Sequence, residues 1–114
     1  MCGETRLKQI IHEVSAKTQT ALGESLREII LYGSYARGDY DDESDIDIMV
    51  LADIGDSEER KLQKSLDKIS GDVSLDNDIT VSILLKDKRL FSSRVGVLPF
   101  YRNIAMEGVE VYGV

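Results

Sequence analysis

The sequence predicts an α/β (α+β) protein in which a small mixed β-sheet carries helices on its surface. Three apolar, partly β-branched runs, residues 26–32, 45–51 and 79–85, have the length and composition of strands. Two longer segments, residues 4–22 and 57–75, repeat apolar residues at the three-and-four spacing of amphipathic helices. Because the second helix connects two strands, a right-handed crossover should make those strands parallel.

The N-terminal half starts with the predicted helix over residues 4–22, which Gly23 should end. The first strand follows it directly. Residues 34–37 are expected to form a short helical turn, and Gly38 is placed to stop that turn because glycine readily takes a left-handed conformation.

The C-terminal part is expected to hold two short helices and a last strand. Residues 88–94 can form the first helix. Pro99 suits the first turn of the next helix and Gly108 lies just past its end, so the two residues bracket residues 100–107. Residues 109–112 alternate apolar and polar side chains, which is typical of a short strand.

Residues 29–51 combine apolar runs, glycines and acidic residues, and we interpret this stretch as the active site. Alternate residues of a strand face the same way, so the side chains of Asp45 and Asp47 should project together while Ile46 and Ile48 point into the core. Two neighbouring carboxylates repel each other unless a cation lies between them. Their hard oxygen atoms suit Mg²⁺.

The turn at Gly33 and Ser34 can supply the other half of a phosphate site. Glycine allows a close approach of the backbone to a ligand, and the hydroxyl and N–H groups that follow can hold an anion. A metal on one side and these donors on the other would bind a nucleoside triphosphate. Arg37 either neutralises the phosphates or forms a salt bridge with the adjacent acids, and both interpretations stay open at this stage.

Together these residues carry a recognisable signature. Gly33 and Ser34, an Ala-Arg-Gly segment and then Asp45 and Asp47, all within residues 30–51, resemble the motif of the minimal nucleotidyltransferases of the DNA polymerase β superfamily. The resemblance implies the nucleotidyltransferase fold, with Asp45 and Asp47 as catalytic ligands of one or two Mg²⁺ ions. It also implies that Gly33 and Ser34 hold the β- and γ-phosphates of the substrate.

One part of the family pattern is missing. A third carboxylate is expected on the strand at residues 79–85, where the corresponding places hold Thr80 and Ser82. If this strand is parallel to its neighbour, Asp78 could reach the metal as a third ligand. Otherwise Asp78 is a strand-start or turn residue. Without a third carboxylate, removal of the proton from the acceptor hydroxyl that attacks the nucleotide would be weaker.

Two other loop motifs fit the stretch less well. Gly33 and Gly38 have the spacing of a P-loop, but Asp39 stands where that motif needs lysine. A calcium loop of the EF-hand type would need a glycine and a glutamate where Ser44 and Val50 stand. A plain solvated turn explains the remaining acids, which are Asp39, Asp41, Asp42 and Glu43.

The composition limits the classes of partner. A chain of 114 residues suits one domain over residues 1–114, and a net charge of −7 argues against a nucleic-acid template, which requires clustered lysine and arginine. The single cysteine, Cys2, cannot form an internal disulfide. We expect a cytoplasmic protein without a membrane span, because no apolar segment is long enough.

Three functional hypotheses follow from the resemblance. Domains of this size resemble the antitoxins of toxin–antitoxin pairs, which transfer AMP from ATP to a tyrosine of a HEPN-domain toxin. The second hypothesis is a nucleotidyltransferase of the aminoglycoside-modifying type, in which a homo-oligomer or a partner would close the site. The third is an antitoxin that has lost catalysis and neutralises its toxin by contact alone. The nucleotide, the acceptor and the oligomeric state are left open.

Overall fold

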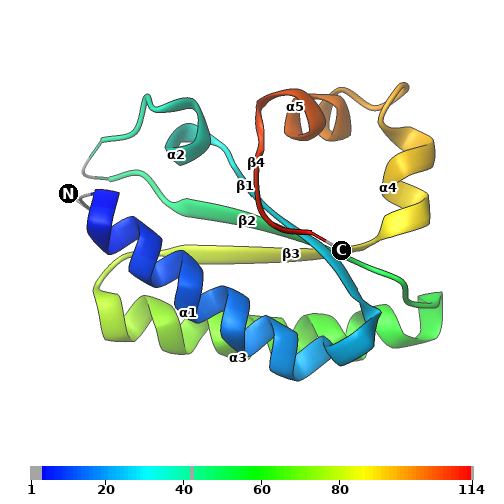
Figure 1. The fold of residues 1–114 in the computed structure, drawn as a ribbon, viewed down its shortest axis with the longest axis horizontal. Coiled ribbons are helices and arrows are strands. Elements are labelled where there is room, and N and C mark those ends of the chain that lie inside the picture. Colours follow the sequence, from blue (N-terminus) through cyan, green and yellow to red (C-terminus); the bar gives the residue numbers. More distant parts are fainter. Residues whose placement is uncertain (1–3, 42, 114) are drawn as a thin grey trace.

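The computed structural model describes residues 4–41 and 43–113 and shows a mixed four-stranded sheet with helices against it (Figure 1). The spatial order of the strands is β3-β2-β1-β4. Their bounds are Leu26–Tyr32 for β1, Ile46–Ala52 for β2, Val81–Asp87 for β3 and Val109–Gly113 for β4. Cys2 and Asp42, both named above, lie outside the described residues.

The long helices α1 and α3 lie side by side on one side of the sheet, and the short helices α4 and α5 lie on the other (Figure 1). A 3-10 turn at residues 23–25 joins α1 to β1. The bounds are Glu4–Leu22 for α1, Ser34–Arg37 for α2, Asp56–Asn77 for α3, Lys88–Arg94 for α4 and Pro99–Glu107 for α5. None of the helices in the described part of the chain has the length and apolar character needed to cross a membrane.

Strand pairing confirms the predicted mixed sheet. The strands β2 and β3, joined through α3, are parallel, whereas β1 pairs antiparallel with both β2 and β4. The registers place Tyr32 opposite Asp47, and Asp47 opposite Ser82. The end of β1 and the starts of β2 and β3 therefore meet at one end of the sheet.

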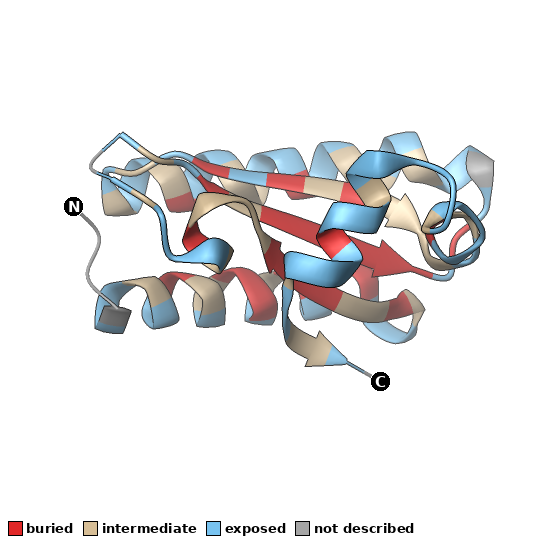
Figure 2. Cartoon of the chain, turned by 90° about the horizontal axis from the view of Figure 1, so that it is seen from above, coloured by how far each residue is buried: buried red, intermediate tan, exposed pale blue. Residues whose placement is uncertain are grey.

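The strand β2 is buried on both faces. Ile46, Ile48 and Val50 pack under α1 and α3, and Met49 and Leu51 pack under α4 and α5. All five are 0% exposed, and Figure 2 shows the buried colour concentrated on the central strands. Burial of apolar surface stabilises the folded state by about 25 cal/mol per Å² removed from water. Because moving β2 would expose such surface on both of its faces, the strand is a rigid support for the residues at its start.

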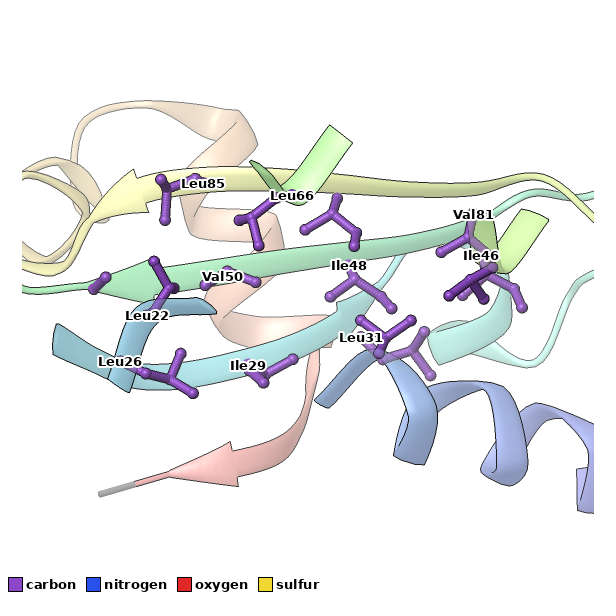
Figure 3. Packing of buried hydrophobic residues seen from close by; sticks show 14 of the residues in the cluster. Leu22, Leu26, Ile29, Leu31, Ile46, Ile48, Val50, Leu66, Val81 and Leu85 are labelled. Atoms are coloured by element: carbon purple, nitrogen blue, oxygen red, sulfur yellow. The ribbon is translucent and has the colours of Figure 1, made fainter. Parts of the chain in front are cut away.

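The larger core lies between the sheet and the two long helices (Figure 3). Apolar side chains from alternate positions of each strand meet one stripe of α1 and one of α3, as the three-and-four spacing predicted. The members that Figure 3 labels are Leu22, Leu26, Ile29, Leu31, Ile46, Ile48, Val50, Leu66, Val81 and Leu85.

The third strand begins at Val81, two residues later than predicted. The helix α3 continues through Gly71 to Asn77, and Asp78 then ends it in a left-handed conformation with φ 53°. Asparagine and aspartate tolerate this conformation better than other residues with side chains. The chain between α3 and β3 is therefore a cap and a turn rather than strand.

The outer edge of β3 is bonded to side chains of α3. Gln63 donates from Nε2 to the carbonyl of Ile83 at 2.9 Å and accepts from the N–H of Leu85 at 2.8 Å. The hydroxyl of Ser74 accepts from the N–H of Val81 at 2.9 Å. Because these backbone groups are already paired, this edge is protected against pairing with another strand.

Candidate active site

The site is built on the turn that leaves β1. Gly33 adopts φ 76° and ψ −156°, a conformation open in practice to glycine alone. A Cβ atom on Gly33 would lie 2.6 Å from Oδ2 of Asp47. Glycine is therefore required twice here, for the backbone conformation and for the close approach of the backbone to the Asp47 carboxylate.

The short helix α2 follows at once. The N–H groups of Ala36 and Arg37 donate to the carbonyl of Gly33, both at 3.1 Å. Gly38, with φ 84°, ends the helix and donates to the carbonyl of Ser34 at 2.9 Å, as predicted. The backbone around Ser34 is thus fixed at both ends, and the half-buried Ser34 begins the helix beside Gly33.

A tyrosine pair that sequence reasoning did not identify supports the loop after α2. The ring of Tyr35 is buried in the main core, and Tyr40 stacks on it with ring centroids 4.3 Å apart and an interplanar angle of 12°. Next to this pair, the exposed Asp41 accepts from the N–H of Glu43 and from the hydroxyl of Ser44. Asp41 therefore shapes the turn, consistent with a plain solvated acidic loop.

Asp45 directly precedes β2, and Asp47 is the second residue of that strand. Asp45 is exposed and Asp47 half-buried, whereas Ile46 and Ile48 lie in the core, as the alternation predicted. Burial raises the pKa of Asp47, the negative charge of Asp45 raises it further, and Arg37 acts in the opposite direction. Two repelling carboxylates form an oxygen donor set that a divalent cation would neutralise, so these residues fit Mg²⁺.

Arg37 forms salt bridges with acidic residues, which is one of the two roles that the sequence left open for it. Its Nε lies 3.1 Å from Oδ2 of Asp39, and its Nη1 lies 3.6 Å from Oε2 of Glu107. The hydrogen bond with Asp39, followed by the charges of Asp39 and Glu107, raises the pKa of Arg37. Because these groups are exposed, the bonds are weak and exchangeable, and Arg37 remains a cation at the rim of the site.

Asp78 does not join the carboxylate pair into a larger group. Among the side chains that the structure describes, no three of acidic residues, histidine or cysteine lie close enough to hold a metal ion. Asp78 caps α3, and Thr80 uses its carbonyl to accept from the N–H of Ile46 at 2.9 Å. The register instead places Ser82, one of the two positions at which the resemblance led us to expect a third carboxylate, beside Asp47.

A cavity of about 220 Å³ adjoins the glycine turn, and sequence reasoning did not predict it. It lies between the end of β1 and α5, and the residues that line it are Tyr32, Gly33, Arg37, Phe100, Asn103, Ile104 and Glu107. Burial raises the pKa of Tyr32, and the charge of Asp47 adds to the effect, so this phenol stays neutral. A larger open cavity of about 560 Å³ lies between α3 and the edge of β3 and contains none of the motif residues.

Comparison with known families agrees with this geometry. The model of the nucleotidyltransferase domain family matches residues 7–111. The chain belongs to this family. The protein named "Putative protein adenylyltransferase MJ0141" of Methanocaldococcus jannaschii is 36% identical to this nucleotidyltransferase over 103 residues, which cover 90% of this chain and 96% of that protein.

Solved structures show the same fold. One is the crystal structure of a toxin-antitoxin with AMP-PNP, at a TM-score of 0.53 and 20% identity, with 89% of this chain and 72% of that chain covered. Another is a tri-AMPylated Shewanella oneidensis HEPN toxin in complex with an MNT antitoxin, at a TM-score of 0.55 and 19% identity, with 94% and 72% covered. The predicted nucleotidyltransferase fold is confirmed.

The contact between Gly33 and Asp47 can be tested against a matched glycine. Gly33→Ala should lower the free energy of unfolding by about 1–3 kcal/mol, because it strains the backbone, and should also displace the Asp47 carboxylate. Gly38→Ala shares the positive φ but has open space around the added Cβ. Thermal unfolding with and without Mg²⁺ and a non-hydrolysable nucleoside triphosphate should show stabilisation by the ligands in Gly38→Ala and none in Gly33→Ala. Equal ligand stabilisation of both variants would contradict the role of the contact.

The repulsion at Asp47 predicts a gain in stability when its charge is removed. Asp47→Asn should stabilise the metal-free protein at neutral pH by less than about 1 kcal/mol, since partly exposed charges are screened. The pKa of Asp47 is raised by folding, so the charged form disfavours the native state. The difference between variant and wild type should therefore shrink as pH falls through that pKa.

Urea denaturation in EDTA across pH measures this effect. Asp76→Asn, which removes an exposed carboxylate of α3, is a control with the same change in net charge. A stability difference for Asp47→Asn that is absent, or that does not depend on pH, would show that Asp47 is not under electrostatic strain.

Proposed function

We propose that this nucleotidyltransferase transfers AMP from ATP to a protein, and that the protein is a HEPN-domain toxin for which the chain is the antitoxin. The observation that carries the proposal is the pairing of Asp45 and Asp47 against the Gly33 turn. The relative from Methanocaldococcus jannaschii, named as a protein adenylyltransferase, is similar over almost its whole length. A toxin-antitoxin of the same fold was crystallised with AMP-PNP, and a HEPN toxin bound to another such antitoxin is AMPylated.

Each motif residue has a role in this reaction. Asp45 and Asp47 would hold Mg²⁺, which when bound stabilises negative charge on the entering and departing oxygen atoms. Gly33 and Ser34 would hold the β- and γ-phosphates, and Arg37 would exchange its exposed salt bridges for a phosphate. The residues thereby orient the α-phosphorus for attack, so that catalysis is mainly positioning and electrostatic stabilisation.

The chemistry of the transfer balances without a further reactant. The acceptor hydroxyl oxygen bonds to the α-phosphorus, the bond to the bridging oxygen breaks, and pyrophosphate leaves. Ser82, which lies beside Asp47, offers no carboxylate to take the hydroxyl proton, so in this proposal the proton passes to solvent and we expect a slow reaction. The same serine supports a second candidate function, an antitoxin that neutralises its toxin by contact without transfer.

Intact-mass measurement separates the two candidates. The protein encoded next to the gene for this chain is incubated with the chain, ATP and Mg²⁺, and the Asp45→Asn/Asp47→Asn variant is the control. We expect the mass of one or more AMP groups on the partner, absent in the control. A stable complex without a change in mass would instead support the contact-only antitoxin.

The register of β3 predicts a gain of function. Ser82→Asp would place a third carboxylate beside Asp47 and should speed AMP transfer by about tenfold or more, because a positioned base assists proton removal. It should also lower the Mg²⁺ concentration needed for half-maximal stabilisation, since ligand charge sets metal affinity. Ser92→Asp, on the exposed side of α4, makes the same charge change away from the site. Equal effects of the two substitutions would show that Ser82 does not face the metal.

A further inference from the structure

The cavity beside the glycine turn adjoins the carboxylate site at Gly33. Gly33 lines it, and the same residue approaches Asp47 so closely that a Cβ would lie 2.6 Å from Oδ2. Tyr32, on the other side of the turn, lies opposite Asp47 in the sheet. Tyr32 and Gly33 therefore border both Asp47 and the cavity, which makes the cavity the nearest pocket for the remainder of a molecule held at the turn.

The cavity has one apolar part. Phe100 and Tyr32 meet edge to face, with ring centroids 5.9 Å apart and an interplanar angle of 85°. Phe100 nevertheless remains 49% exposed, while Ile104, one turn further along α5, is buried against the sheet and anchors the helix. An aromatic ring that is held in place yet half-open to solvent offers a surface on which a flat ring can stack.

The charged part of the cavity lies at its rim. Phe100, Asn103 and Glu107 line one face of α5 at spacings of three and four residues. Glu107 at the end of that face pairs with Arg37 at 3.6 Å. Arg37, which also lines this rim, would take a phosphate in the proposed function, and the region of Tyr32, Phe100 and Asn103 is then left for an uncharged group.

Asn103 gives this uncharged region a hydrogen-bonding pattern. Its amide is exposed and forms no hydrogen bond with the described part of the chain. An asparagine amide donates and accepts along one edge and pairs with both N6 and N7 of adenine. Guanine presents two acceptors on the same edge, O6 and N7, so the amide would satisfy adenine better.

We propose that this cavity binds the base of the nucleotide and that Asn103 selects adenine over guanine. The proposal rests on the proposed function for the nucleotide and for the position of its phosphates, and it adds the place of the base and the residue that selects it. The volume supports a base rather than a whole nucleotide, because 220 Å³ is below the roughly 300–1,000 Å³ of pockets that enclose drug-sized ligands.

Calorimetric binding of AMP-PNP and GMP-PNP in the presence of Mg²⁺, without any acceptor protein, tests the proposal. Wild type should bind AMP-PNP about tenfold more tightly than GMP-PNP, and Asn103→Ala should remove most of that preference. Phe100→Leu should weaken both nucleotides to a similar extent, because stacking does not distinguish bases. Met106→Ala is the control on the same helix, since Met106 is 77% exposed and does not line the cavity.

The outcomes separate this inference from the function on which it rests. Equal binding of the two nucleotides by wild type, or an unchanged preference in Asn103→Ala, overturns the inference while AMP transfer can still be observed. No binding of either nucleotide by folded wild type overturns both. If the Phe100 and Asn103 variants keep nucleotide affinity but lose transfer to the acceptor protein, the cavity holds an acceptor side chain, and the inference is wrong.

Discussion

The close approach of the Gly33 backbone to the Asp47 carboxylate is the constraint on which the rest of the site depends. It is possible because Gly33 lacks a Cβ atom and adopts a positive φ, and because Tyr32 and Asp47 are paired across two neighbouring strands. The turn at Gly33 also supplies the carbonyl that holds the first turn of α2. One glycine thus joins the end of β1, the start of α2 and the carboxylate pair into a single rigid corner.

This corner is held in place by burial of the strand that carries Asp47. The strand β2 has core on both faces, so the backbone that carries the half-buried carboxylate is held by packed neighbours. Burial and the neighbouring Asp45 both raise the pKa of Asp47. The fold therefore maintains negative charges at a position where they are unfavourable by themselves, which is the arrangement expected of a site that binds a cation.

The local elements of the fold were predictable because their signals lie within a few residues. The strand β1 and the helices α1, α2 and α4 begin and end where the spacing and the glycines predicted. The third strand was placed two residues early, since the β-branched residues Ile79 and Thr80 suggested a strand while the left-handed cap at Asp78 moved its start to Val81. A cap of this kind depends on how the helix meets the sheet and has no strong local signal at aspartate.

The sequence by itself determined the chemistry of the motif: the pairing of Asp45 with Asp47, the need for glycine at Gly33 and the alternation that points both acids away from the core. These follow from backbone geometry over short distances. Only the tertiary structure decided that Ser82 rather than Thr80 lies beside Asp47, and that α5 forms a cavity next to the turn. Strand register and helix docking are set by contacts between distant segments, because the free energy of burying their shared surface cannot be read from either segment alone.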